Sequence, residues 1–391
     1  MAGGAADGAR GRRKPTRRAT WARWAYWIHG LAGLKLGLVL SFIMVTGTLA
    51  VFGHEIDWLF GPYQRVVPDG EAAGLAEVYA AARAARPDHA ILRVEAPRGP
   101  RSVATVLSVS PARQYRHLYV DPYRPEAVAE TSPLTAQNLL RQIHQSLLLP
   151  KYGRLFVSGL SILTLLSLIS GLICYKRFWR GFLKVPRRRD LRTFLGDTHR
   201  LAAVWSLWFI AVMAVTGLWY FYESLDTFGE HYAQPSLSDA VLARAGAVPP
   251  DPPVAAAITA ARAALPGLKV RHLVLPDSAR DPLVIEGYTG AWLVRPRAAQ
   301  VRVDPTTGQV LAARPAQALG VKARLHEAAD PLHFGDFAGI WSKLVWFVFG
   351  AALSFLSISG LVIHAKRLAR APPRRSAPAV AGKGAWAAGD T

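Results

Sequence analysis

The sequence predicts an α-helical membrane protein whose four transmembrane helices come from a duplicated helix–module–helix unit, with two small α+β modules outside the membrane. The first observation behind this fold class is a set of four apolar runs. Residues 155–175, 201–221 and 344–363 contain no charged residue, and residues 28–53 contain only Lys35. Because an α-helix rises about 1.5 Å per residue, each run is long enough to cross a hydrocarbon core of about 30 Å.

The second observation is the location of the charge, which is formally +21. Residues 1–27, 176–200 and 365–391 contain 22 of the 47 Lys and Arg residues but only four of the 26 Asp and Glu residues. Basic flanks beside apolar runs are what the positive-inside rule produces. The charge therefore predicts a lipid bilayer as the environment and cytoplasmic termini, and it argues against a nucleic-acid partner.

The third observation is a histidine pattern that occurs twice. A histidine at the start of the first and third runs precedes Thr-Gly by 17 and 18 residues, and one before the second and fourth runs precedes Ser-Gly by 26 and 27. The four sets are His29 with Thr46-Gly47, His199 with Thr216-Gly217, His144 with Ser170-Gly171, and His333 with Ser359-Gly360. Two copies in the same orientation predict a pseudo-two-fold axis along the membrane normal.

These observations divide the chain into nine segments. In order, they are a basic cytoplasmic tail (1–27), a first span (28–55), an outer module (59–143), a second span (154–175), a basic cytoplasmic loop (176–198), a third span (199–222), a second outer module (223–335), a fourth span (341–364) and a cytoplasmic tail (365–391). The first span follows basic residues, as a signal peptide does. Its length and the lack of an A-x-A site predict an uncleaved anchor.

Each outer module begins with an Ala-rich amphipathic helix, GEAAGLAEVYAAARAARP in the first and PPVAAAITAARAALP in the second. Short β-prone runs follow, at 90–95, 102–109 and 115–121, and near 270–275, 282–287, 291–295 and 299–304. The second module closes with VDPTTGQVL, whose Asp-Pro and Thr-Gly pairs predict a turn between two strands.

The paired histidines predict a cofactor. A two-fold axis would bring His29 to His199 near the cytoplasmic surface and His144 to His333 near the outer surface. Two imidazoles that face each other across a bundle are what a six-coordinate b-type haem iron requires. The one cysteine, Cys174, excludes intrachain disulfides, Cys-ligated clusters and C-x-x-C-H attachment of haem.

Neighbouring residues fit the same hypothesis. Gly33 and Gly37 share a helix face with His29 and would leave room for a flat macrocycle. Lys35, Arg200 and Arg154 are candidates to meet haem propionates. Two further histidines, His54 and His364, have no repeat mate and are held as reserve ligands.

A structural interpretation of the same residues stays open. A histidine at a membrane surface is often only an amphipathic anchor, and glycines in a membrane helix also let helices approach. The remaining histidines, at positions 89, 117, 231, 272 and 326, are interpreted as structural or surface residues. No G-x-G-x-x-G, P-loop or H-E-x-x-H pattern predicts a nucleotide, flavin or zinc site.

Four stretches resemble the PepSY-associated transmembrane helix family: WIHGLAGLKLGLVLSFIMVTG, IHQSLLLPKYGRL, DTHRLAAVWSLWFIAVMAVTGLWYF and LHFGDFAGIWSKLVWF. The outer module that ends in VDPTTGQVL resembles a PepSY domain. The family includes iron-regulated inner-membrane proteins, some of them dihaem ferrisiderophore reductases. The resemblance implies that His29, His199, His144 and His333 ligate haem, and that periplasmic PepSY-like modules receive the ferric chelate.

The predicted function is therefore a dihaem b-type cytochrome of the bacterial inner membrane that reduces a periplasmic ferric siderophore or other ferric chelate. A quinol or a cytoplasmic partner would supply the electrons to two haem b groups. One alternative is a quinol–haem relay to another periplasmic acceptor. The other is a non-redox membrane anchor that displays PepSY modules as sensors or inhibitors.

Overall fold

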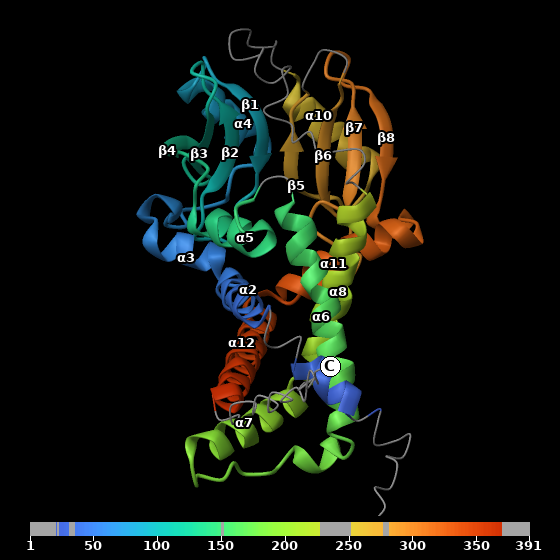
Figure 1. Ribbon diagram of the computed structural model, residues 1–391. Coiled ribbons are helices and arrows are strands. Elements are labelled where there is room, and N and C mark those ends of the chain that lie inside the picture. Colours follow the sequence, from blue (N-terminus) through green and yellow to red (C-terminus); the bar gives the residue numbers. More distant parts are fainter. Residues whose placement is uncertain are drawn as a thin grey trace, which may run out of the picture.

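The computed structural model describes residues 21, 23–30, 36–149, 152–226, 252–276 and 281–369. Within them, a β-sheet forms one end of the molecule and a bundle of helices forms the other (Figure 1). The sheet is continuous, antiparallel and eight-stranded, in the order β4-β3-β2-β1-β5-β6-β7-β8. Its strands are β1 (Ala90–Glu95), β2 (Ala104–Val109), β3 (Tyr115–Asp121), β4 (Glu126–Thr131), β5 (Lys269–Val274), β6 (Leu283–Tyr288), β7 (Ala299–Val303) and β8 (Val310–Arg314).

The two halves of the chain meet in the middle of this sheet. Strand β1 pairs with β5, and Val94 lies opposite Leu273 while Glu95 lies opposite His272. Each half contributes a four-stranded meander between two helices, α4 (Leu75–Ala85) and α5 (Ala136–Ser146) in the first half, and α10 (Val254–Ala264) and α11 (Val321–Phe334) in the second. The two modules predicted from the sequence therefore share one sheet. The β-prone run 291–295 is a loop between β6 and β7 and not a strand.

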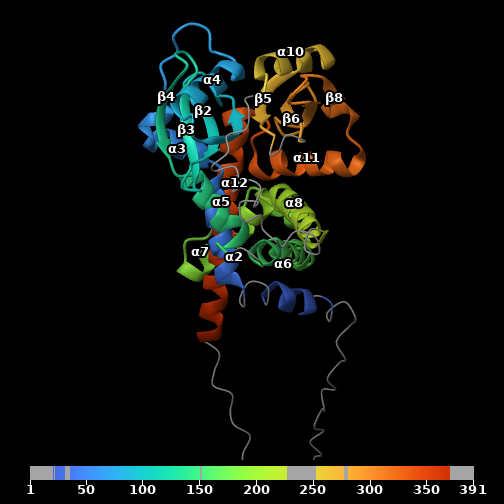
Figure 2. The same cartoon turned by 90° about the horizontal axis from the view of Figure 1, so that it is seen from above.

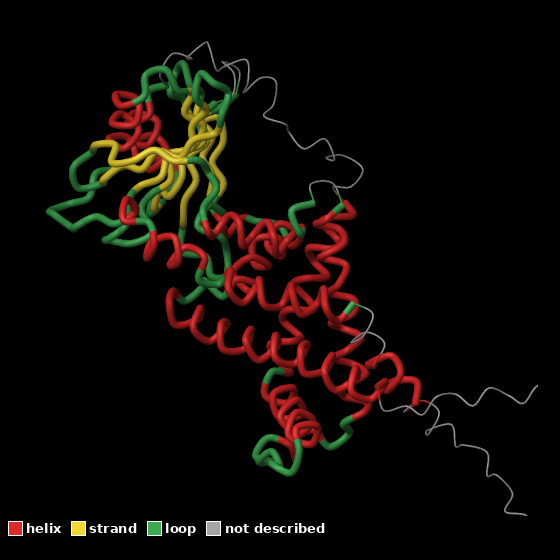
Figure 3. Tube along the Cα trace, turned by 60° about the vertical axis from the view of Figure 1, so that its left-hand side comes forward, coloured by secondary structure: helices red, strands yellow, loops and turns green. Residues whose placement is uncertain are grey.

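The two faces of the sheet differ in chemistry because side chains alternate along a strand. One face carries the apolar set that includes Val94 and Val106, and the helices α4 and α10 cover it. The other face carries Arg93, Glu95 and His117 and is turned to the helical bundle (Figure 3). The apolar face of the sheet thus packs in a hydrophobic core, and the polar face is directed to the bundle.

Three helices of the described chain are long and apolar enough to cross a membrane: α6 (Gly153–Cys174), α8 (Leu207–Asp226) and α12 (Gly339–Ala369). A fourth crossing results if α2 (Gly37–Ala50) and α3 (Gly53–Phe60) are one span with a bend of 58°. These helices make the protein a multi-pass membrane protein.

The first span differs from the predicted continuous run of 28–55, because the chain bends between α2 and α3. Charged residues in α3 explain the bend. The Asp57 carboxylate accepts the backbone N–H groups of Ala136 and Gln137 at 2.6 and 3.0 Å, at the free start of α5. The Glu55 carboxylate accepts a hydrogen bond from Nζ of Lys343 at 2.5 Å. Both acids therefore find polar partners at the surface of the bundle instead of entering lipid.

The third span also begins later than the predicted 199–222. Helix α7 (Leu191–Trp205) starts at Asp190, whose carboxylate accepts the backbone N–H groups of Arg192 and Thr193. It ends before Ser206, and α8 continues from Leu207. Helix α7 lies across the end of the bundle farthest from the sheet (Figure 1). Helices α6 and α12 overlap the predicted second and fourth spans.

The helices pair across the two halves of the chain. Helix α2 packs along α12, and α6 packs along α8; the two pairs lie side by side in the view from above (Figure 2). Small polar residues form the first contact, with the hydroxyls of Ser41 and Ser357 2.8 Å apart. In the second, a Cβ added to Gly217 would lie 2.8 Å from Cβ of Ser161. Small residues let membrane helices approach closely, so these positions set the width of the bundle.

Candidate functional site

Four histidines named from the sequence each contact a neighbouring helix through Nδ1. Close to the sheet, His144 on α5 makes a hydrogen bond from Nδ1 to the carbonyl oxygen of Ile43 on α2, at 2.9 Å. In the other half, Nδ1 of His333 on α11 lies 2.8 Å from Oγ1 of Thr216 on α8. We call these two residues the sheet-side pair.

The other two histidines make the same kind of contact at the opposite end of the bundle. His29 lies in the first described helical segment, and its Nδ1 is 3.1 Å from the carbonyl oxygen of Ser167 and 3.2 Å from the hydroxyl of Ser170, both on α6. The Nδ1 atom of His199 on α7 is 2.8 Å from the hydroxyl of Ser359 on α12. We call His29 and His199 the distal pair.

These contacts explain why the Thr/Ser-Gly motifs recur at fixed offsets. Each Thr/Ser-Gly motif contacts a histidine that lies on a different helix of the same half of the chain. Thr46-Gly47 receives His144, Ser170-Gly171 receives His29, Thr216-Gly217 receives His333, and Ser359-Gly360 receives His199. A Cβ added to Gly47 would lie 2.5 Å from Cε1 of His144, so this glycine is required for the ring to fit.

The hydroxyl in these motifs has a lone pair left for the imidazole because its own proton is used elsewhere. Thr216 donates its hydroxyl to the carbonyl oxygen of Val212 at 2.8 Å, and Ser359 donates to that of Leu356 at 3.2 Å. The hydroxyl oxygen then accepts Nδ1–H of the histidine. This arrangement favours a neutral imidazole with its lone pair on Nε2, which is the form that binds a metal.

The sheet-side pair has the spacing of two ligands on one metal. The ring centroids of His144 and His333 are 6.1 Å apart, with an interplanar angle of 39°. Two imidazoles that bind one metal from opposite sides through bonds of about 2 Å have ring centres about 6 Å apart. Among the described residues, no group of three or more His, Cys, Asp or Glu side chains could hold a bare metal ion. Two imidazoles would leave the other positions of a metal to ligands that come with it, as in haem.

A cavity of about 1080 Å³ surrounds the sheet-side pair. Within the bundle its walls are mostly apolar and include Leu40, Val157 and Leu353, with the small residues Gly47 and Gly350. Such walls would suit a flat macrocycle held by the two imidazoles. Beyond the histidines the cavity continues as far as the polar face of the sheet. We call this second part the chamber.

The distal pair is less fully defined by the described residues. His29 and His199 lie within electrostatic range of each other, at the end of the bundle farthest from the sheet. The reserve ligand His364 approaches this site, because a Cβ added to Gly30 would lie 3.3 Å from its Cε1. The other reserve ligand, His54, lines the cavity of the sheet-side pair.

The remaining predicted residues have mixed placements. Arg154 lines the cavity, as a residue that meets propionates would. Arg200 forms an ion pair with Asp197. Gly37 packs against α12, where an added Cβ would lie 3.4 Å from Leu361, so it serves helix contact. Gly33 and Lys35 lie outside the described residues.

Two histidines that we interpreted as structural or surface residues lie in the chamber wall. His117 on β3 and His272 on β5 both line the cavity, and the Nδ1 atom of each is buried without a hydrogen-bond partner among the described residues. Burial lowers the pKa of both. For His272, the neighbouring arginines add to the effect of burial and bring the pKa to about 4. The sequence held no signal for them, because their position depends on the pairing of β1 with β5.

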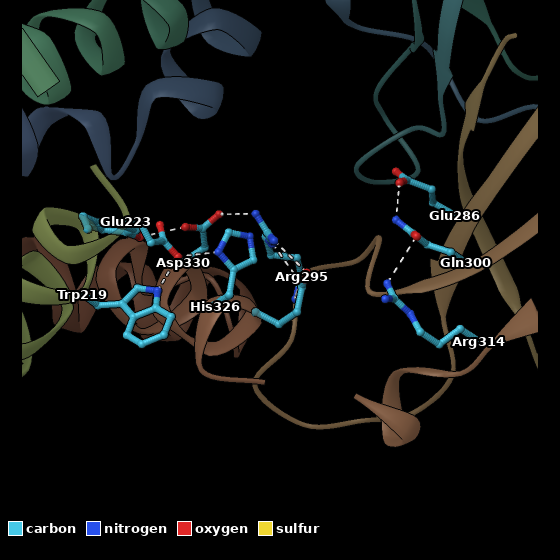
Figure 4. Close-up of polar contacts among 10 residues, drawn as sticks. Trp219, Glu223, Glu286, Arg295, Gln300, Arg314, His326 and Asp330 are labelled. Carbon is cyan, nitrogen blue, oxygen red and sulfur yellow. Dashed lines mark hydrogen bonds and ion pairs between the residues drawn. The ribbon is translucent and has the colours of Figure 1, made fainter. Parts of the chain in front are cut away.

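A chain of contacts joins the sheet-side pair to the chamber, and Figure 4 labels two of its members, Asp330 and Arg295. The Tyr220 ring lies edge-on to His333, with centroids 5.2 Å apart, and its hydroxyl donates to Asp330 at 2.8 Å. Asp330 in turn pairs with Arg295 at 3.3 Å, and Arg295 also pairs with Glu327 at 2.7 Å. These partners fix the Tyr220 ring against the histidine.

The fold and the site together define a multi-pass membrane protein in which paired histidines lie between helices beneath a sheet. The chain belongs to the family described as the PepSY-associated TM region, whose profile matches residues 26–367. It is also 26% identical, over 271 residues, to the uncharacterized protein PA4219 of Pseudomonas aeruginosa. That match covers 62% of this chain and 66% of the relative, slightly less than two thirds of the relative's length.

The lowered pKa of His272 predicts a pH-dependent stability. Between about pH 6.5 and 4 the unfolded chain takes up a proton at this residue that the folded chain resists, so the stabilisation present above pH 6.5 is lost as the pH falls toward 4. His272→Gln removes this difference. We expect its melting temperature in detergent to fall less between pH 7 and pH 4.5 than that of the wild type. Equal falls for the two proteins would contradict the prediction.

Proposed function

We propose that the protein is a dihaem b-type cytochrome of the bacterial inner membrane that reduces a ferric chelate on the periplasmic side. The observation that carries this proposal is the sheet-side pair, with ring centroids 6.1 Å apart in a cavity that continues into the chamber. His144 and His333 would hold one haem, and His29 and His199 the other. When bound, haem supplies reversible one-electron transfer.

The residues around the sheet-side pair have separate tasks in this proposal. The Nδ1 contacts of His144 and His333 hold each ring in one orientation with Nε2 free. Apolar walls keep water away from the iron, which is one of the means by which a protein sets a redox potential. Arg141 and Arg154 line the same cavity and would pair with the propionates. The chamber then gives a soluble acceptor a place next to the site.

The orientation in the membrane follows from charge. The basic loop, residues 176–198, lies at the end of the bundle farthest from the sheet, which the positive-inside rule assigns to the cytoplasm. The sheet and the chamber would then face the periplasm. Electrons from a quinol or a cytoplasmic partner would enter near the distal pair and leave near the sheet-side pair.

The first test is the haem content of the full chain purified in detergent from cells supplied with haem. We expect a reduced-minus-oxidised spectrum of low-spin b haem and about two haems per chain in a pyridine haemochrome assay. The spectrum would lack one haem in His144→Ala and in His333→Ala. The control His326→Ala lies on α11 as well, but it contacts Glu223 on α8 and should keep both haems.

Three outcomes would contradict the proposal at different levels. A folded wild-type protein without haem would exclude the cytochrome and favour a membrane anchor that displays the sheet. Loss of the distal haem in His364→Ala but not in His199→Ala would overturn the distal pairing only. Full haem content without reduction of any ferric chelate would favour a relay to another periplasmic acceptor.

The Nδ1 contacts generate a second test. Ser359→Ala removes the hydroxyl that accepts Nδ1–H of His199, so the imidazole becomes a weaker donor to iron and the reduced state gains stability. A hydrogen bond of about 1 kcal/mol corresponds to a rise of about 40 mV for one electron. A spectroelectrochemical titration should show this rise for one haem only.

The control for this titration is Ser357→Ala, two residues away on the same helix. Ser357 contacts the hydroxyl of Ser41 on α2 and no histidine contact is known for it in the described chain. Both potentials should stay at their wild-type values in this variant. An unchanged potential in Ser359→Ala would show that the hydroxyl does not tune a ligand.

A further inference from the structure

The chamber has an excess of positive charge. Nine Lys and Arg residues line the cavity, but only four Asp and Glu residues do. Some of the cations have partners in the bundle: Arg295 pairs with Glu327 and Asp330, and Lys343 pairs with Glu55. The helix-borne Arg141 and Arg154 are closest in sequence to the sheet-side pair and its span, where haem propionates would use them.

Five cations remain on the sheet side of the chamber, in the strands and in the loops that follow them. They are Arg93, Arg98, Lys269, Arg271 and Arg297. Among the lining residues of this wall, the one acid is Glu95, which is 3.8 Å from Arg93. This group, which we call the arginine wall, comes from both halves of the chain. The pairing of β1 with β5 brings the two contributions together.

The arginine wall concentrates positive charge that nearby acids offset only in part. Burial is the largest cause that lowers the pKa of Arg98, Arg271 and Arg297, and a neighbouring arginine lowers each further. Acids oppose this shift, chiefly Glu95 for Arg98 and Arg271 and Glu286 for Arg297. Guanidinium groups stay charged at any physiological pH, so the fold holds several partly buried cations against their mutual repulsion. An anion with several carboxylates would relieve that repulsion and accept bidentate hydrogen bonds.

Other residues of the chamber suit a bulky ligand that carries both rings and charges. Trp58, Trp292, Tyr119 and Tyr288 also line the cavity. His117 and His272 line the same cavity, and the Nδ1 atom of each is buried without a hydrogen-bond partner among the described residues. Aromatic faces and unused polar atoms beside guanidinium groups are typical of a ligand site.

We propose that the arginine wall selects ferric chelates of net negative charge that carry free carboxylates, which bind between the sheet and the bundle above His144 and His333. This inference rests on the proposed function for the identity of the metal. It adds that the substrate has a net negative charge, and it names the residues that bind this charge. A neutral chelate would leave the repulsion among the guanidinium groups in place, and a cationic chelate would add to it, so both would bind weakly.

The test uses gallium(III) chelates, because gallium(III) replaces ferric iron in such ligands and is not reduced. The full chain in detergent is titrated calorimetrically with gallium citrate, which is anionic, and with a cationic gallium trihydroxamate. We expect citrate to bind at least roughly tenfold more tightly than the trihydroxamate, and its affinity to fall as salt is added. Equal affinities, or no binding of citrate, would overturn the proposal.

Variants of the wall identify the residues. Arg98→Gln and Arg297→Gln should each weaken citrate binding by roughly tenfold or more, as loss of a hydrogen bond to a charged group predicts. Arg98→Lys keeps the charge and should restore part of the affinity. The control is Arg124→Gln, an exposed residue paired with Asp69 outside the chamber, which should bind citrate as the wild type does. Wild-type affinity in both wall variants would overturn the proposal.

The outcome is independent of the redox proposal. If a folded protein without haem binds gallium citrate, the proposal for the arginine wall is supported and the reductase proposal is excluded. If a protein with two haems reduces a cationic chelate and does not bind citrate, the reductase proposal is supported and the proposal for the arginine wall is excluded.

Discussion

The architecture depends on one interaction, the hydrogen bond from a histidine Nδ1 to a hydroxyl or carbonyl oxygen of a membrane helix. In each half, one histidine binds near the sheet and one at the far end, so every half is tied together at both ends of the bundle. The helix pairs α2–α12 and α6–α8 join one half to the other. The histidine contacts within each half and the helix pairs between the halves together hold the bundle as one unit around the histidines.

The same interaction links packing to chemistry. A hydroxyl that donates to its own helix and accepts from Nδ1 fixes the orientation and protonation of the ring. Glycine beside the hydroxyl removes the Cβ that would strike the ring, as at Gly47. A Ser-Gly or Thr-Gly pair therefore serves helix packing and, in the proposed function, would also prepare Nε2 of His199 or His333 for a metal. This double role explains why histidine and motif recur together in the sequence.

The sheet has a comparable double role. Its apolar face forms a core with α4 and α10, and its polar face covers the end of the cavity. Because strands alternate their side chains, Arg93 and Glu95 point to the chamber while Val94 points to the core. The two halves contribute equally to the centre of this wall through β1 and β5. In the proposed function, the face of the sheet that covers the end of the bundle would also bind the soluble acceptor.

Local chemistry along the chain specifies several of these features without any tertiary contact. Apolar length identified the spans, charge identified the flanks, and matched offsets identified His29, His144, His199 and His333, because helix period and hydrophobicity act over short stretches of chain. Only the tertiary structure decided which motif receives which histidine, and that His272 lies in the chamber. Those facts depend on contacts between residues more than a hundred positions apart, such as His144 with Ile43, and no local pattern encodes such distances. The bend after α2 is of the same kind, since it follows from the bonds of Asp57 to the start of α5.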